Sequence, residues 1–366
     1  MAKQKISRSS LIIASIFSFI IGLFFGIYLH HTNNLPTSDK LISGDLKIHF
    51  LELGNKYSGD SILIQIGEYD ILVDAGSRSN SMSTIKQYID THIQDDTLEY
   101  VIVTHADRDH IAALAGNGET SLFSYYKTGT IIQFAKTNSA SATYTNYLSM
   151  VDKEKQEGTK VYTALQCYQN LDGCSRKIDL GHGVEIEILY NYYYENSSTD
   201  ENNYSVCFLI NQGDNHFLFT GDLENEGETK LIEYNTLPEV TLFKAGHHGS
   251  KTSSTKALLD IIKPQIIVVT CVAGSYEYTN NSNNTFPTLE VLERIANYTD
   301  KVYVTSEAIS ECVNGECSDT GYKSLNGNIT ITSNYNGVIV NGSNHNRILK
   351  ETDWFISNRN TIDAWK

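Results

Sequence analysis

Four apolar segments of the chain each end in side chains that bind metal ions well, and this recurrence limits the folds that the chain can adopt. The endings read ILVDAG, VIVTHADRDH, FLFTGD and FKAGHHGS. A strand delivers the chain to one edge of a sheet, where the following loop can turn its side chains toward a common point. Chance would place such residues after one or two strands, but hardly after four. The pattern therefore predicts a metal site at a sheet edge.

Strands and helices alternate through most of the chain, with several hairpins between them. This order favours sheets covered by helices on the outside, in two similar halves. Helical spacing predicts helices over residues 81–92, 224–234, 253–262 and 287–298, and a helix with loops within 137–160. Strands are predicted over 46–51, 61–66, 71–73, 100–104, 131–134, 184–189, 204–211, 216–220, 240–244, 265–270, 302–304, 327–333 and 337–341.

The segment THADRDH carries two imidazoles and two carboxylates within seven residues. An imidazole and a carboxylate two residues apart, His105 and Asp107, can face one ion, and the pair Asp109 and His110 can face a second. The alternative is a solvated loop whose aspartates cap the helix predicted at residues 111–114. Likewise, Asp222 could cap the helix at 224–234, and the two histidines of KAGHHGS could lie on the surface. The recurrence at four strand ends favours the metal interpretation.

Residues 1–31 differ from the rest of the chain. Lys3, Lys5 and Arg8 precede the uncharged run at residues 11–29, which as a helix would rise roughly 28 Å, close to the hydrocarbon thickness of a bilayer. A cleaved signal peptide or a buried helix is the alternative, but the run has no polar face, and its end, GIYLHH at residues 26–31, is poor for cleavage. We therefore predict a cytoplasmic tip and single transmembrane signal anchor over 1–31, a linker over 32–45, and an extracytoplasmic remainder attached to the cell membrane.

Charge restricts the binding partners of this remainder. The whole chain carries a net charge of −15, and the anchor holds three of the positive charges, so residues 32–366 carry about −18. Such an acidic domain does not bind nucleic acid through bulk electrostatics, although metal ions could supply local positive charge toward a polyanion. The external location makes short-range disulfides plausible. The closely spaced pairs are Cys167 with Cys174 and Cys312 with Cys317, whereas Cys207 and Cys271 are expected to be buried thiols.

Together these segments resemble the metallo-β-lactamase superfamily, and most of all the extracytoplasmic hydrolase domain of ComEC-type competence proteins. The resemblance covers residues 46–341 and implies a four-layer αββα sandwich of the α/β (α+β) class, with a hydrolase domain over 46–345, a tail over 346–366, and a site between the two sheets. It is carried by GDSILIQIGEYDILVDAG (59–76), VIVTHADRDHIAAL (101–114), NNYSVCFLI (202–210), FLFTGDLENEGE (217–228), FKAGHHGSKTSS (243–254), FPTLEVLERI (286–295) and GNITITSNYNGVIV (327–340).

The resemblance also implies a ligand set. The superfamily motif is usually His-x-His-x-Asp-His, and the ComEC-like branch resembles the His-x-Asp-x-Asp-His of this chain, which gives Asp107 the second ligand position. His105 and Asp107 would face one ion, Asp109 and His110 the other, and Asp222 would bridge them. The additional carboxylate makes the site harder and more anionic, which widens the expected ions from Zn²⁺ to Mn²⁺.

One of the two histidines in KAGHHGS is expected to complete the site, with His248 preferred and His247 as its substitute. Two histidines that the superfamily often supplies are absent. Residues 201–205 read ENNYS where one is usual, and Phe286-Pro287 stands where a His-Pro pair is usual. One or two bound ions are therefore both consistent with the sequence.

The function that these residues imply is a metal-dependent hydrolase, a phosphodiesterase or nuclease that acts through metal-bound hydroxide on nucleic acid or on a cell-wall phosphodiester. Asp109 is expected to orient the attacking water, and His248 either binds an ion or lies near the leaving group, with His247 as the alternative. Hydrolysis of carbonyl esters, lactones or lactams would use the same hydroxide. A surface binding module that has lost turnover is the third possibility.

Overall fold

The computed structural model of the protein describes residues 45–334 and 336–366. The anchor predicted over 1–31, and the linker predicted over 32–45 except for its last residue, lie outside the described residues. Within the described part of the chain, no helix is long and apolar enough to cross a membrane.

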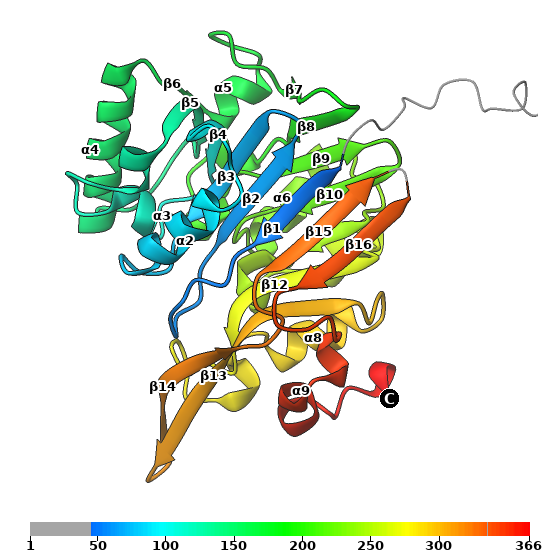
Figure 1. Ribbon diagram of the computed structural model, residues 1–366. Helices are drawn as coiled ribbons and strands as arrows, with labels where there is room; N and C mark the ends of the chain where they lie inside the picture. The colour runs from blue at the N-terminus through cyan, green and yellow to red at the C-terminus, as the bar shows by residue number, and fades with distance from the viewer. Residues whose placement is uncertain (1–44, 335) are drawn as a thin grey trace, which may run out of the picture. The chain divides into compact units, whose positions relative to one another are not determined.

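The first of two eight-stranded sheets has the strand order β16-β15-β1-β2-β3-β4-β5-β6 (Figure 1). Strands β3 to β6 run parallel, and the other neighbours pair antiparallel. Its strands are β1 (Leu46–Phe50), β2 (Ser61–Ile66), β3 (Tyr69–Ala75), β4 (Thr97–Val103), β5 (Lys127–Gln133), β6 (Lys160–Thr163), β15 (Ile329–Asn334) and β16 (Gly337–Gly342).

The second sheet repeats this plan with the order β14-β13-β12-β11-β10-β9-β8-β7. Strands β10 to β13 are parallel, and the flanking strands are antiparallel. Its strands are β7 (Lys177–Asp179), β8 (Val184–Ile188), β9 (Phe208–Gln212), β10 (Asn215–Phe219), β11 (Leu242–Lys244), β12 (Ile266–Ala273), β13 (Val302–Val313) and β14 (Glu316–Ser324).

Alternating side chains place the second sheet between two apolar layers. On β12, Ile266 and Val268 join the core between the sheets, whereas Ile267 and Val269 join the core beneath the second set of helices. The first sheet is covered by α2 (Ser81–Asp90), α3 (Arg108–Ala115) and α4 (Ala142–Glu157), with the short α5 (Ala164–Tyr168) nearby, and the second by α6 (Asn225–Tyr234), α7 (Lys256–Ile262), α8 (Leu289–Ile295) and α9 (Asp353–Asn358). The described residues thus form the predicted mixed α/β sandwich.

The hairpin of β13 and β14 was not predicted from the sequence. The predicted strand ended at residue 304, whereas β13 continues to Val313 and the hairpin extends beyond the sandwich (Figure 1). Its outer part is solvated, with Ile309 45% and Val313 66% exposed, so no hydrophobic alternation marks it in the sequence. The disulfide Cys312–Cys317 closes its tip.

Both predicted disulfides are present, since Cys167 is bonded to Cys174 as well. The remaining pair of cysteines, Cys207 and Cys271, are free and buried, as expected. Residues 346–366, which were predicted to be a tail, pack against the second core of the sandwich. Side chains from this segment that are buried in the second core are Leu349, Trp354, Phe355, Ile362 and Trp365.

One buried histidine, His49 on β1, should make the fold sensitive to acid. Its Nδ1 lies 2.9 Å from the Tyr88 hydroxyl, its Nε2 has no hydrogen-bond partner, and burial followed by the charge of His92 lowers its pKa from 6.5 to about 3. The unfolded chain therefore takes up a proton below pH 6.5 while the folded protein does not. Stability should fall as the pH drops, by about 2 kcal/mol at pH 5 from this residue.

Urea denaturation at pH 7.5 and pH 5.0 measures this effect, with His49→Gln as the comparison. The variant should lose about 2 kcal/mol less between the two pH values than the wild type. An equal loss in both proteins would contradict the assignment.

Candidate metal centre

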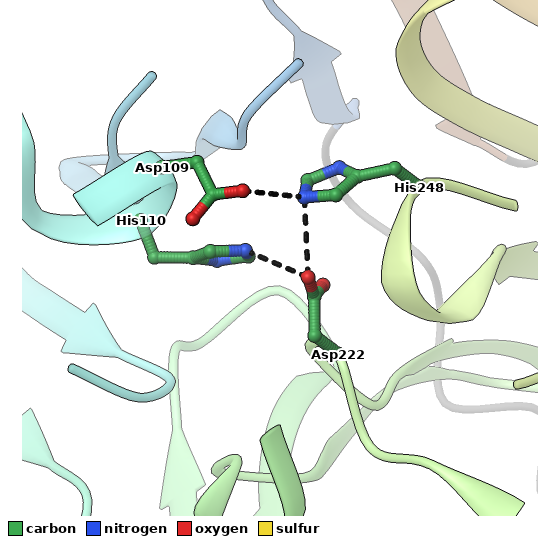
Figure 2. A group of neighbouring side chains, drawn as sticks. All are labelled: Asp109, His110, Asp222 and His248. Atoms are coloured by element: carbon green, nitrogen blue, oxygen red, sulfur yellow. Dashed lines mark ion pairs between the residues drawn. The ribbon is translucent and has the colours of Figure 1, made fainter. Parts of the chain in front are cut away.

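Four side chains from both sheets meet at one edge of the sandwich. Asp109 and His110 lie in the first turn of α3, a short loop after β4, while Asp222 follows β10 and His248 follows β11 (Figure 2). One ligand atom from each lies within 4.8 Å of the others. The loops at the ends of parallel strands therefore bring together residues up to 139 positions apart, as the sequence pattern predicted.

Asp222 is the centre of this cluster. Its Oδ2 lies 3.1 Å from His110 Nε2 and 3.1 Å from His248 Nε2, while His248 Nε2 is 3.5 Å from Asp109 Oδ2. Ligands held about 2.1 Å from a tetrahedral ion are about 3.4 Å apart, so these spacings suit a zinc-sized cation. The two Nε2 atoms and Asp222 Oδ1 are buried without a hydrogen bond of good geometry, and buried polar atoms of this kind suit a metal-ligand role.

Partners behind the two imidazoles fix their orientation. His110 Nδ1 lies 2.8 Å from Asp74 Oδ2, and Asp74 in turn accepts hydrogen bonds from the backbone N–H and the hydroxyl of Thr104. His248 Nδ1 donates to the carbonyl oxygen of Thr270 at 2.9 Å. With Nδ1 engaged in each ring, Nε2 points into the cluster, which is the usual arrangement of metal-binding histidines.

The carboxylates around His110 and His248 raise the pKa of both imidazoles. Burial alone would lower the pKa of His110, but Asp222 and Asp74 raise it well above the usual value. Burial would also lower the pKa of His248, but the charges of Asp222 and Asp60 raise it well above the usual value. Metal binding at Nε2 of either ring therefore competes with a proton.

The backbone of the KAGHHGS segment is strained. His247 and His248 both adopt left-handed conformations, with φ of 46° and 53°. This region disfavours residues with a Cβ atom, and such strain persists only where the surroundings enforce it. Glu228 contributes to that enforcement, because its buried carboxylate accepts hydrogen bonds from the N–H groups of Ser254 and Thr255, just beyond the segment. In this conformation His248 Nε2 lies 3.1 Å and His247 Nε2 lies 3.9 Å from Asp222 Oδ2.

The remaining predicted ligands lie beside this cluster, next to His110 and His248. His105 is fully buried, its Nε2 has no hydrogen-bond partner, and it lies 3.7 Å from Asp107 Oδ2. Asp107 is at the rim, with 45% of its side chain exposed, and burial with the charge of Asp109 raises its pKa to about 6. His247 Nε2 lies 3.9 Å from Asp222 Oδ2, and its Nδ1 lies 3.0 Å from Glu224 Oε1.

The structure brings Asp109, His110, Asp222 and His248 together in one compact group. The other predicted ligands lie beside this group: the His105 ring is 4.1 Å from that of His110 and its Nε2 is 3.7 Å from Asp107, while His247 Nε2 is 3.9 Å from Asp222 Oδ2.

Sequence reasoning missed a buried ion pair beneath the cluster. Lys244, 1% exposed, places Nζ 2.5 Å from Asp60 Oδ2 and 3.6 Å from Asp222 Oδ1. Although burial opposes it, the pKa of Asp60 is held low by Lys244. Asp60, Asp74 and His110 could geometrically hold a cation, but the ammonium of Lys244 already pairs with the carboxylate of Asp60. A single lysine within the apolar segment VTLFKAG was the feature that could have revealed it.

The positions without the usual histidines have other contacts. Glu201 accepts hydrogen bonds from the backbone N–H of Ala106 and the hydroxyl of Thr137, and so ties the ligand loop to the segment after β5. The ring of Phe286 lies 5.8 Å from that of His247 and 6.2 Å from that of His248. Phe286 has no ligand atom, and the Glu201 carboxylate is engaged by Ala106 and Thr137.

Close packing beneath the ligand loop explains one glycine of the ILVDAG segment. A Cβ atom on Gly76 would lie 2.1 Å from the backbone carbonyl of Asp109. The carbonyl oxygen of Asp109 also accepts a hydrogen bond from the N–H of Asp60. The start of α3 therefore rests directly on the loop after β3, which fixes the height of Asp109 and His110 above the sheet.

Comparison with known proteins places this geometry in context. The family model described as anti-Pycsar protein Apyc1 matches residues 51–260. Recombination protein 2 of Haemophilus influenzae is 26% identical over 290 residues, which cover 78% of this chain and 30% of that protein. ComE operon protein 3 of Bacillus subtilis is 25% identical over 215 residues, 57% of this chain and 24% of that protein. The chain thus spans less than a third of either relative.

Among solved structures, the metallo-β-lactamase fold protein YhfI of Bacillus subtilis matches 72% of this chain and 96% of its own, at 12% identity and a TM-score of 0.42. The resemblance to competence proteins, first seen in the sequence motifs, is confirmed by the two curated relatives.

Proposed function

The chain belongs to the family described as anti-Pycsar protein Apyc1, and from this premise we propose that it is a metal-dependent phosphodiesterase. The observation that carries the proposal is the buried cluster centred on Asp222, in which two imidazoles and two carboxylates converge. A hydrogen bond at Nδ1 holds each of the two imidazoles in place. Its carboxylate content suits Mn²⁺ as well as Zn²⁺.

Two sets of residues around Asp222 would hold the ions. Asp109, His110 and His248 with Asp222 fit one ion. We propose that a second ion is held by the looser group of His105, Asp107 and His247, with Asp222 shared. In this arrangement His247 supplies an imidazole where the superfamily's usual histidines are absent.

A bound ion would supply a water of lowered pKa as the nucleophile and would polarise the phosphoryl oxygen. Asp109 is placed to orient that water, because it lies on the open side of the cluster with 17% of its side chain exposed. His248, which is buried and points at Asp222, suits a ligand role. His247, 22% exposed, is the better placed of the two to approach a leaving group. The ring of Phe286 limits water access beside both.

The test begins with metal analysis of the purified full-length protein, followed by hydrolysis of bis(p-nitrophenyl) phosphate and DNA with Mn²⁺ or Zn²⁺. We expect turnover that a chelator abolishes and added metal restores, and that Asp109→Ala lowers strongly while the circular dichroism spectrum is unchanged. Cleavage of nitrocefin or a lactone without any phosphodiester hydrolysis would replace this proposal with the carbonyl hydrolase. Firmly bound metal with no turnover of any substrate would favour a binding module.

Location at the cell membrane is a second part of the proposal. It is supported by the uncharged run at residues 11–29 and its positive flank, which predict an extracytoplasmic domain. Nucleic acid or a cell-wall phosphodiester would then be the accessible substrate. Protease added to intact cells should remove the domain, and cleavage only after lysis would reverse the orientation.

A further inference from the structure

A tyrosine from a distant loop reaches the open side of the metal centre. Tyr278 lies in the segment between β12 and α8, and its hydroxyl donates to Asp109 Oδ2 at 3.4 Å. The residue is nevertheless 57% exposed. The hydroxyl end therefore points at the cluster while the ring remains open to whatever approaches the ions.

Tyr278 also forms part of an aromatic surface beside the cluster. Its ring lies 5.6 Å from that of Phe286, at an interplanar angle of 37°. Phe286 in turn contacts the rings of His247 and His248. The two aromatic rings thus form an apolar wall that starts at the imidazoles and ends in solvent.

Contacts on both sides hold the loop that carries Tyr278. On one side, Asp319 of β14 accepts hydrogen bonds from the Ser275 hydroxyl at 2.6 Å and the Tyr276 N–H at 3.0 Å. On the other, Glu277 forms an ion pair with Arg78 and accepts a hydrogen bond from the Ser58 N–H at 3.1 Å. This support on either flank is the kind of arrangement that keeps a substrate contact in place.

The phenol is a hydrogen-bond donor at neutral pH. A tyrosine side chain carries its hydroxyl proton at neutral pH, because its ordinary pKa is about 10. A neutral phenol beside a cation site can donate to an anionic oxygen without competing for the metal.

From this geometry we infer that Tyr278 is a substrate-contacting residue of the proposed phosphodiesterase. Its hydroxyl donates to a non-bridging oxygen of the phosphodiester that lies over Asp109, and its ring with Phe286 packs against one planar ester group. The inference rests on the proposed function, and it predicts a preference for diesters with an aromatic or similarly flat substituent over those with small alkyl groups.

Binding of phosphinates tests the inference without turnover, because these anions contain no ester bond. Diphenylphosphinate and dimethylphosphinate are titrated calorimetrically into the Mn²⁺-loaded full-length protein. Tyr278→Phe, which removes only the hydroxyl, should weaken both by about tenfold, as expected for one hydrogen bond to a charged group. Tyr278→Leu should in addition reduce the preference for the diphenyl compound. Tyr276→Phe is the matched control, because Tyr276 lines a separate cavity with Arg359.

The outcomes separate this inference from the proposed function. Weaker binding to Tyr278→Phe with unchanged metal content supports the contact, even if the wild type hydrolyses no diester and the phosphodiesterase proposal fails. Unchanged affinity in Tyr278→Phe, or no phosphinate binding by the metal-loaded wild type, overturns it. A loss of bound metal in Tyr278→Phe also overturns it, since the hydroxyl would then act only by positioning Asp109.

Discussion

Asp222→Asn is expected to remove at least one metal ion per chain and to lower kcat/KM for a phosphodiester by about a thousandfold or more, since an ion contributes several kcal/mol to stabilising the transition state. The reason is the central place of this carboxylate, whose Oδ2 lies 3.1 Å from both His110 Nε2 and His248 Nε2. Asparagine has nearly the same shape but no charge. It cannot bridge two cations, and its amide hydrogens would oppose any cation between the imidazoles.

Inductively coupled plasma mass spectrometry after gel filtration gives the metal content, and initial rates with bis(p-nitrophenyl) phosphate give kcat/KM. Asp214→Asn, an exposed aspartate in the turn between β9 and β10, is the matched control and should change neither quantity. If Asp222→Asn retains the full metal content, the bridging role proposed for Asp222 is wrong. In that event the loss of activity alone would point to a role in orienting water.

The second large effect is expected from Lys244→Met in metal-free protein, which should lose about 3–5 kcal/mol of stability, the cost typical of leaving a buried charge without its partner. Lys244 is 1% exposed and compensates Asp60, which is 2% exposed, and Asp222. Methionine fills similar space but leaves two carboxylates together in a dry environment. Bound metal should restore part of the stability, because a cation neutralises Asp222 from the other side.

Urea denaturation in a chelator, repeated with Mn²⁺, measures these free energies of unfolding. The double variant Asp60→Asn with Lys244→Met should be more stable than Lys244→Met alone, because it removes the uncompensated charge as well. The control is Lys256→Met, which removes an exposed lysine and should leave stability close to that of the wild type. A Lys244→Met protein as stable as the wild type would show that the ion pair is replaceable by packing.

Local patterns in the sequence were sufficient to predict most of the elements that build the site. Strand β2 has the predicted bounds. The bounds of helices α2 and α6 differ from the predicted ones by at most two residues. Apolar alternation and helical spacing act over a few residues, and they reflect burial that every such strand or helix requires. The same local reading placed Asp109, His110, Asp222 and His248 at strand ends, where the structure brings them together.

The missed features are contacts between segments that are distant in the sequence. The ion pair of Lys244 with Asp60 joins the second sheet to the first, and Tyr278 reaches Asp109 across 169 positions. Nothing near any of these residues in the sequence encodes its partner, because each pair forms only when the two sheets pack face to face. The β13–β14 hairpin escaped prediction for a related reason, since its exposed strands bury too little to leave an apolar pattern.

The sequence by itself therefore determined which residues lie at strand ends and that they could bind cations, because those properties depend on side-chain type and on burial over short stretches. Only the tertiary structure decided how the site is arranged. It placed His110 and His248 against Asp222 and His105 against Asp107, set the ammonium of Lys244 beneath them, and brought Tyr278 over the open side. The physical reason is that these distances are fixed by the packing of two sheets and their covering helices, which no local segment specifies.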